Sequence, residues 1–147
     1  MNTSRWFINT HYTLHNKNTH STLHNPMDQL FAFEQLEVYQ IARQYVKNIY
    51  ELSDAFPTKE DFALTSQIRR AAVSVTSNVA EGTSRFSLKD KSHFMEIAYG
   101  SLMETYSQLQ VAVDLGYISE DSVARIAPFV VELRNKLSAL RRSYNEK

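Results

Sequence analysis

The sequence has no cysteine and only three glycines and three prolines in 147 residues. Without cysteine the chain forms neither a disulfide scaffold nor a thiolate zinc site, and it has no cysteine nucleophile. The few glycines form no G-x-G-x-x-G or G-K-S/T motif, which excludes most phosphate-binding loops. The apolar runs are only a few residues long, so we predict no membrane-spanning segment. We expect a cytoplasmic protein.

The composition changes near residue 26. Residues 1–26 contain five Asn, five Thr and four His, with two basic residues and no acidic ones. Such a polar segment does not bury enough apolar surface to offset the entropy lost on ordering. We therefore predict a disordered tail at 1–27 and one folded domain at 28–147. Two explanations of the tail remain open: translation begins at Met27, or the tail has a function of its own.

The tail contains two histidine pairs with helical i, i+4 spacing, His11 with His15 and His20 with His24. On a helix each pair would share a face and converge on a metal ion. Asn and Thr are poor helix formers, however, and no carboxylate completes the ligand set. We predict no metal site.

Four helices are predicted from helix-capping residues and from apolar residues at three- and four-residue spacing. Ser or Thr followed three residues later by Asp is a capping signal, and it occurs at Thr58 and at Ser87. The expected helices run from about Glu34 to Ser53, Thr58 to Gly82, Ser87 to Leu115, and Ser119 to near Tyr144. We expect Gly116 to stop the third helix and Ser119 to open the fourth. Short loops between helices of this length predict an all-α fold, an antiparallel up-down-up-down four-helix bundle.

The apolar positions also predict which faces are buried. On the second helix, Ile68 to Val79 form one narrow face, and the stripe expected in the core of the third helix includes Ile97 and Leu115. Pro128 falls inside the fourth pattern, where it either kinks the helix or separates a first short segment. Gly82 is placed as the residue that ends the second helix.

Catalytic chemistry is poorly represented in the folded part. His93 is its single histidine, and no local arrangement completes a Ser-His-Asp triad. The acidic pairs Glu60–Asp61 and Glu120–Asp121 fall in first helical turns, where they complement the helix dipole. We predict that the protein is not an enzyme, with no catalytic residue, no cofactor and no small-molecule substrate.

A polar flank borders the core face of the second helix. It consists of Gln67, Ser74, Asn78 and Glu81. Two interpretations remain open: a half-buried stripe that fixes helix register, or a recognition surface. On the third helix Gly100 precedes Ser101, and a glycine inside a helix costs about 1 kcal/mol relative to alanine, so we expect close helix packing there.

Basic residues form local groups next to aromatic ones. The candidate contacts to a partner or to nucleic acid are Arg69, Arg70, Arg85, Lys89 and Lys91. Lysine and arginine nevertheless only equal aspartate and glutamate in number, 16 against 16, so the chain has no general attraction for phosphate. Aromatic residues make up 12 % of the sequence, more than one small core accommodates, and this favours self-association.

Several motifs together resemble a known bacterial family. They are Phe33-Glu-Gln-Leu-Glu-Val-Tyr, Gln67-Ile-Arg-Arg-Ala-Ala-Val-Ser74, Ser77-Asn-Val-Ala-Glu-Gly82 and Phe94-Met-Glu-Ile-Ala-Tyr-Gly-Ser-Leu-Met-Glu104. They closely resemble the four helix bundle protein family, also called the S23 ribosomal protein or 23S rRNA-intervening-sequence protein family. The similarity covers about residues 31–143.

The resemblance implies a bundle that assembles into a ring-like homo-oligomer, most often a pentamer. Its signature positions here are Gln67, Arg69, Arg70, Ser74, Asn78, Glu81, Gly82, Gly100 and Ser101. We expect Asn78 and Glu81 to make structural bonds, and Arg69 or Arg70 to be available to partners. Related accessory proteins of diversity-generating retroelements bind nucleic acid through a basic barrel, and the balanced charge of this chain departs from theirs.

Two functions therefore stand. The first is a non-enzymatic homo-oligomeric bundle that acts as an assembly or adaptor module. The alternative is an accessory protein that binds RNA or DNA through basic patches assembled in the oligomer.

Overall fold

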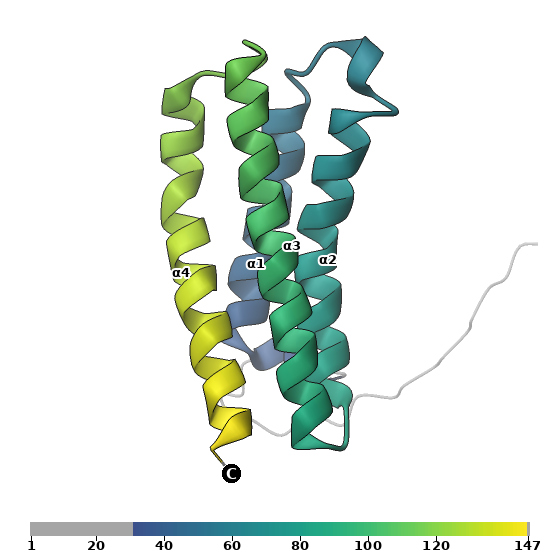
Figure 1. Ribbon diagram of the computed structural model, residues 1–147, viewed down its shortest axis with the longest axis vertical. Helices are drawn as coiled ribbons and strands as arrows, with labels where there is room; N and C mark the ends of the chain where they lie inside the picture. Colours follow the sequence, from purple (N-terminus) through teal and green to yellow (C-terminus); the bar gives the residue numbers. More distant parts are fainter. Residues whose placement is uncertain (1–30, 147) are drawn as a thin grey trace, which may run out of the picture.

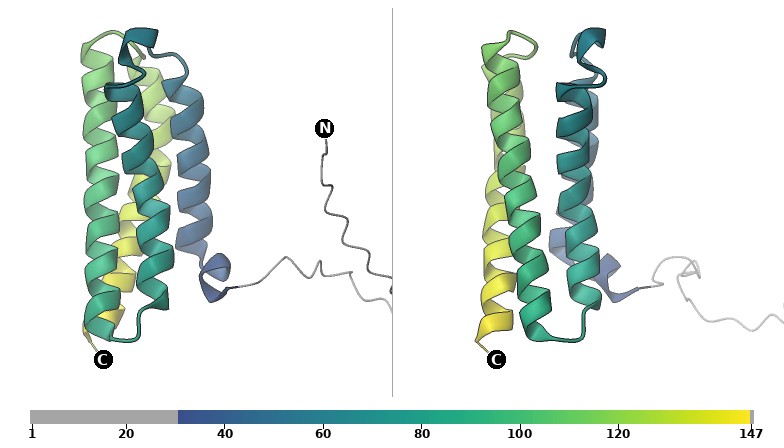
Figure 2. Two further views of the ribbon diagram at one scale, coloured as in Figure 1. Left: turned by 90° about the vertical axis from the view of Figure 1, so that its right-hand side faces the viewer. Right: turned by 45° about the vertical axis from the view of Figure 1, so that its right-hand side comes forward.

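The computed structural model describes residues 31–146, which form four long α-helices and two short 3-10 helices. In chain order the elements are η1 (Ala32–Gln35), α1 (Glu37–Ser53), η2 (Thr58–Glu60), α2 (Leu64–Ser84), α3 (Leu88–Asp114) and α4 (Glu120–Asn145). Consecutive helices run in opposite directions, and the views in Figures 1 and 2 show them side by side along one axis. The predicted all-α four-helix bundle is confirmed. The predicted tail and its histidine pairs lie outside the described residues.

The first helix begins later than predicted. Glu34 belongs to the short helix η1, and the extended backbone of Leu36 (φ −72°, ψ 123°) separates η1 from α1. The ring of Phe33 meets the ring of Tyr39 edge-on, with 4.8 Å between centroids. This aromatic contact packs η1 against the first turn of α1.

The predicted capping role of Thr58 is wrong. Thr58 starts η2, and α2 begins only at Leu64. The first N–H of α2 is satisfied instead by Glu60, whose Oε2 accepts a 3.3 Å hydrogen bond from Leu64. The other oxygen of Glu60 accepts a 2.9 Å bond from the hydroxyl of Tyr117, in the loop after α3. A partner distant in the sequence therefore positions the carboxylate that starts α2.

The other helix ends follow local chemistry. Ser87 Oγ accepts the Asp90 N–H at 3.0 Å, and Ser119 Oγ accepts the Ser122 N–H at 3.2 Å, so both predicted N-caps are confirmed. Gly116 follows α3 with φ +72°, a conformation that favours glycine.

The predicted helix end at Gly82 is wrong, and one of the two alternatives for Pro128 is excluded. The helix α2 continues past Gly82 to Ser84, so Gly82 lies in its last turn and does not end it. The helix α4 runs unbroken through Pro128, which excludes a separate first segment. In residues 31–146, no helix is both long enough and apolar enough to cross a bilayer.

The core lies along the bundle axis and draws on all four helices. Its fully buried large side chains include Tyr45, Ile68, Met95, Leu102 and Leu133. The face predicted on α2 is buried. Ile97 of α3 and Leu115, the residue that follows α3, are 38 % and 52 % exposed, so their predicted core positions are wrong. Met95 takes the buried place instead because the inward face of α3 is rotated toward it.

Candidate functional site

The polar residues singled out in the sequence converge on one groove between α2 and α3. Gln67, Arg70 and Ser74 of α2 and Glu104 of α3 line a hollow of about 360 Å³. We call this surface the α2–α3 groove; further along it lie Asn78 and Glu81 of α2 and Ile97, Gly100 and Ser101 of α3. Residues three or four apart share a helix face, which is why these positions form two facing rows.

A second hollow adjoins the groove across α2. It measures about 680 Å³ and shares Arg70 and Ser74 with the first. Its other lining residues include Tyr50 of α1 and Val73 and Ser77 of α2. The outer side of α2 is therefore recessed from α1 across to α3.

Asn78 and Ser74 connect the two sides of the groove. The Asn78 side-chain amide donates to the Ser74 carbonyl at 2.7 Å and to the Ser74 hydroxyl at 2.9 Å. The Ser74 hydroxyl in turn lies 2.8 Å from that of Ser101 on α3. Because the amide and both hydroxyls are hydrogen-bonded, the stripe fixes the register between α2 and α3, as one of the two interpretations of the sequence expected.

The two adjacent arginines of α2 have different surroundings. Arg69 donates from Nε to Ser53 Oγ and from Nη2 to Asp54 Oδ1, both at 2.7 Å. Its guanidinium also lies over the Tyr50 ring, 4.8 Å from the centroid. Arg69 thus joins α2 to the end of α1, whereas Arg70 is exposed and, within residues 31–146, has no carboxylate within 4.0 Å.

The other three candidate basic residues lie at the opposite end of α2. Arg85 forms an ion pair with Glu81 and lies over the Phe94 ring, 4.6 Å from its centroid. Lys91 donates to the Thr83 carbonyl at 2.9 Å, and Lys89 is exposed. Fifteen residues of helix, about 22 Å, separate Arg70 from Arg85, so the protomer does not gather the five cations into one patch.

The two helical glycines differ in what surrounds them. A Cβ on Gly82 would lie 2.6 Å from both Met95 Cε and Phe94 Cβ, so this glycine allows close packing of α2 on α3. A Cβ on Gly100 would have no such neighbour within 4 Å. The predicted packing role of Gly100 is therefore wrong within the protomer.

Exposed apolar side chains surround the groove. Val73 and Ile97 are each 38 % exposed and Val111 is 43 % exposed. Val73 and Glu104 were not among the site residues predicted from the sequence. Their spacing carried the signal: Val73 is three residues from Arg70, and Glu104 is three residues from Ser101 and four from Gly100.

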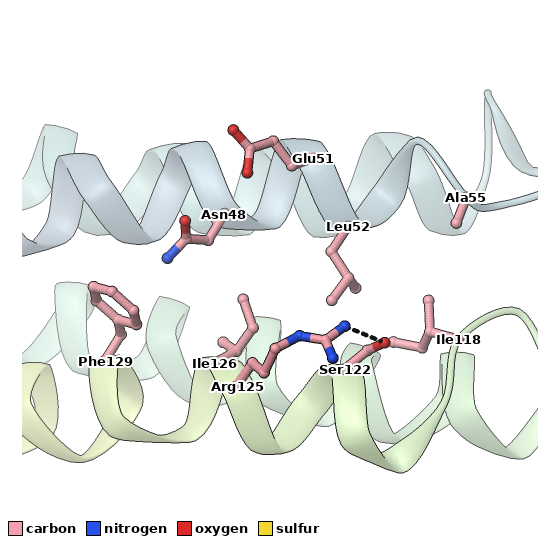
Figure 3. Close-up of a pocket in the computed structure, with 9 residues that line it drawn as sticks. All are labelled: Asn48, Glu51, Leu52, Ala55, Ile118, Ser122, Arg125, Ile126 and Phe129. Carbon is pink, nitrogen blue, oxygen red and sulfur yellow. Dashed lines mark hydrogen bonds between the residues drawn. The ribbon is translucent and has the colours of Figure 1, made fainter.

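A further groove lies between α1 and α4. Its volume is about 530 Å³, and its walls include Leu52, Ile126 and Phe129 (Figure 3). Figure 3 shows the Arg125 side chain extended along α4, where its guanidinium donates to Ser122 Oγ at 3.1 Å. In residues 31–146, no group of three His, Asp or Glu side chains is placed to hold a metal ion.

Comparison with known proteins adds to this geometry. A family model described as 23S rRNA-intervening sequence protein matches residues 34–139. A similar solved structure is a crystal structure of a protein of unknown function from the S23 ribosomal protein family of Bacteroides thetaiotaomicron VPI-5482. The two chains share 21 % identity with a TM-score of 0.65, and the match covers 71 % of this chain and 97 % of the other. This likeness shows the fold. No curated protein matches the chain.

Proposed function

The chain belongs to the 23S rRNA-intervening sequence protein family, and on that premise we propose that it is a non-enzymatic bundle that assembles with copies of itself as an assembly or adaptor module. The family resemblance implies a ring, most often a pentamer. Head-to-tail contacts between two different faces of a protomer give such rings when the rotation closes. The α2–α3 groove is the face that we assign to this contact.

The observation that carries the proposal is the environment of Gly100. A glycine inside a helix costs about 1 kcal/mol relative to alanine. Gly82 offsets that cost by allowing α2 and α3 to approach closely, but nothing in the protomer lies where a Gly100 side chain would be. Close approach of a second protomer to α3 would explain why position 100 is a glycine.

The surroundings of Gly100 support the same role. Ile97, one turn away on α3, and Val73, next to Ser74 on α2, expose apolar surface near it, and association with a second copy removes this surface from water. The small side chain of Ser74 in the wall of the hollow leaves room for another backbone or for bulky side chains. A recessed, partly apolar surface with hydrogen-bonded polar groups is typical of protein interfaces.

The chemistry of the groove supports a non-enzymatic role. A serine nucleophile requires a general base within hydrogen-bond reach. The hydroxyls of Ser74 and Ser101 are bonded to each other, and the other side-chain contact of Ser74 is the neutral amide of Asn78. These groups hold helices together.

The alternative function, RNA or DNA binding, has less support in the protomer. Among the five candidate cations, Arg69 and Arg85 are paired with carboxylates and Lys91 is bonded to a backbone carbonyl. Phosphate binding depends on the number of phosphates that cations neutralise. Arg70 lies on α2 and Lys89 in the first turn of α3, beyond the far end of α2, and only assembly of several protomers would bring such residues into one patch.

Light scattering coupled to size-exclusion chromatography tests the proposal. The full chain is purified without nuclease, and absorbance is recorded at protein and nucleic-acid wavelengths. We expect a mass that is a multiple of the 17.0 kDa protomer and a protein-like spectrum. A protomer mass at all concentrations would contradict self-assembly. Nucleic-acid absorbance that is lost at high salt would instead favour the alternative function.

A further inference from the structure

The face next to the α2–α3 groove has the opposite character. Met103 and Tyr106 of α3 lie half-buried against the core. They follow Tyr99 at helical spacing, and Tyr99 lines a hollow with Leu137 and Arg141 of α4, so all three lie on the side of α3 that faces α4. Beside them on α4, Val131 is 47 % exposed and Arg134 is exposed. We call these four residues the α3–α4 ridge. The groove has the small residues Ser74, Gly100 and Ser101 between its two rows of side chains, whereas the ridge consists of four bulky side chains.

The two surfaces also carry charges that can pair across a contact: the groove contains the carboxylate of Glu104 beside the cation Arg70, and the ridge contains the cation Arg134. The Glu104 carboxylate accepts a 3.2 Å bond from Gln108, and no cation of residues 31–146 lies within 4.0 Å of it. The guanidinium of Arg134 donates only to the side chain of its neighbour Asn135, at 3.3 Å, with no carboxylate of the described chain within the same limit. Each protomer therefore has an unpaired carboxylate in the groove and an unpaired guanidinium on the ridge.

Glu104 and Arg134 lie at the same height along the bundle. The 3.0 Å ion pair between Glu96 and Arg141 sets the register of α3 and α4. Glu104 is eight residues from Glu96, about 12 Å, and Arg134 is seven residues from Arg141, about 10 Å, at 1.5 Å per residue. Because α3 and α4 are antiparallel, both displacements point the same way along the axis (Figure 1).

The relation between the faces suits a closed assembly. The groove and the ridge share α3, so they are neighbouring sides of the bundle and not opposite sides (Figure 1). A head-to-tail contact between neighbouring sides turns the chain of protomers at every step, and a ring forms when this rotation closes. When protomers stand parallel in such a ring, residues at equal height meet.

We propose that the α3–α4 ridge of a second copy packs into the α2–α3 groove, with Arg134 of one protomer opposite Glu104 of the next. This proposal rests on the self-assembly proposed above, and it names the surface that the groove receives. The ion pair sets the relative height of the two protomers.

Charge reversal tests the pairing in the full chain. We expect Glu104→Arg and Arg134→Glu each to weaken association roughly tenfold or more, because each places like charges face to face. The double variant restores a cross-protomer ion pair and regains most of the affinity. Arg125→Glu, an equal reversal on the α1 side of α4, is the matched control and leaves association unchanged. Circular dichroism of each variant verifies that the bundle is folded.

Other outcomes separate the two proposals. If the unmodified chain is a single protomer, the proposed function fails and the pairing fails with it. If the chain assembles but the double variant stays as weak as the single ones, self-assembly stands and the pairing is overturned. Rescue of Glu104→Arg by Arg43→Glu, on the face between α1 and α2, would also overturn it.

Discussion

The hydroxyls of Ser74 and Ser101 lie 2.8 Å apart and join α2 to α3 at the centre of the groove. The Ser101 hydroxyl also lies 3.0 Å from the Ile97 carbonyl, and a carbonyl can only accept. A hydroxyl has one proton, so Ser101 donates to Ile97 and Ser74 donates to Ser101. The same bonds that hold the protomer together therefore also shape the surface that we assign to assembly.

These donor and acceptor assignments predict the effect of removing the Ser101 hydroxyl. Ser101→Ala leaves the half-buried Ser74 hydroxyl without its acceptor, and we expect a loss of about 1 kcal/mol in the free energy of unfolding. Urea unfolding at a fixed protomer concentration measures it. Ser77→Ala, an exposed serine of the same helix, is the control and should change the value by less than about 0.5 kcal/mol. Equal effects of the two substitutions would contradict the assigned bond.

The two arginines of α2 should differ in their effect on stability. Arg69→Ala removes two hydrogen bonds to the end of α1 and the contact with Tyr50, and we expect a loss of about 1–2 kcal/mol. Arg70→Ala removes an exposed side chain and should cost less than about 0.5 kcal/mol. Thermal unfolding of both variants measures the two losses in stability. A larger loss for Arg70→Ala would be inconsistent with the structure.

Replacing each of the two helical glycines by alanine should change stability in opposite directions. In Gly82→Ala the new methyl group pushes the side chains of Met95 and Phe94 away from α2, and we expect a loss of about 2 kcal/mol or more in the free energy of unfolding. Gly100→Ala should stabilise the dissociated protomer by about 0.5–1 kcal/mol because its methyl group meets nothing and the helix gains propensity. Urea unfolding in dilute solution compares them. Destabilisation of the dissociated protomer by Gly100→Ala would refute the assignment of Gly100 to an external contact.

The buried Tyr45 predicts how stability depends on alkaline pH. Its hydroxyl has no hydrogen-bond partner of normal geometry among the described residues, and burial raises the pKa of Tyr45 well above its ordinary value of 10.0, although the nearby Thr105 hydroxyl opposes the shift. Above pH 10.0 the unfolded chain ionises first and binds fewer protons than the folded one, so Tyr45 lowers stability as pH rises from there toward its folded pKa.

Tyr45→Phe tests this sign. The variant lacks the ionisable group, so its stability should fall less steeply than that of the native chain above pH 10.0, and at neutral pH it should be at least as stable. Urea unfolding at a series of pH values measures both slopes. Identical slopes would show that Tyr45 ionises equally in the folded and unfolded chains.

The sequence predicted what local chemistry determines. The N-caps Ser87 and Ser119 and the stop at Gly116 depend on residues within one turn, so their patterns were sufficient. Together with the apolar spacing they predicted the four-helix bundle, and the quoted motifs indicated the family, which the match over residues 34–139 confirms.

What failed depends on contacts between distant residues. The start of α2 is fixed by Glu60 and Tyr117, which are 57 residues apart, so no local pattern contained it. The predicted core stripe of α3 was also too wide, because it rested on the spacing of apolar residues alone. That spacing did not show whether Ile97 or Met95 faces the core. The predicted polar flank of α2 did mark the groove, but its opposite wall, with Glu104, required the packed pair of helices.

A reactive thiol tests the assembly face most directly, because the native chain contains no cysteine. Gln67→Cys places a single thiol in the α2–α3 groove, and Lys47→Cys places one on the exposed outer side of α1. We predict that the groove thiol of the assembled protein reacts with a maleimide several-fold more slowly than the α1 thiol. Addition of Glu104→Arg should release the protection. Equal rates at both positions in the assembled protein would contradict assembly through this groove.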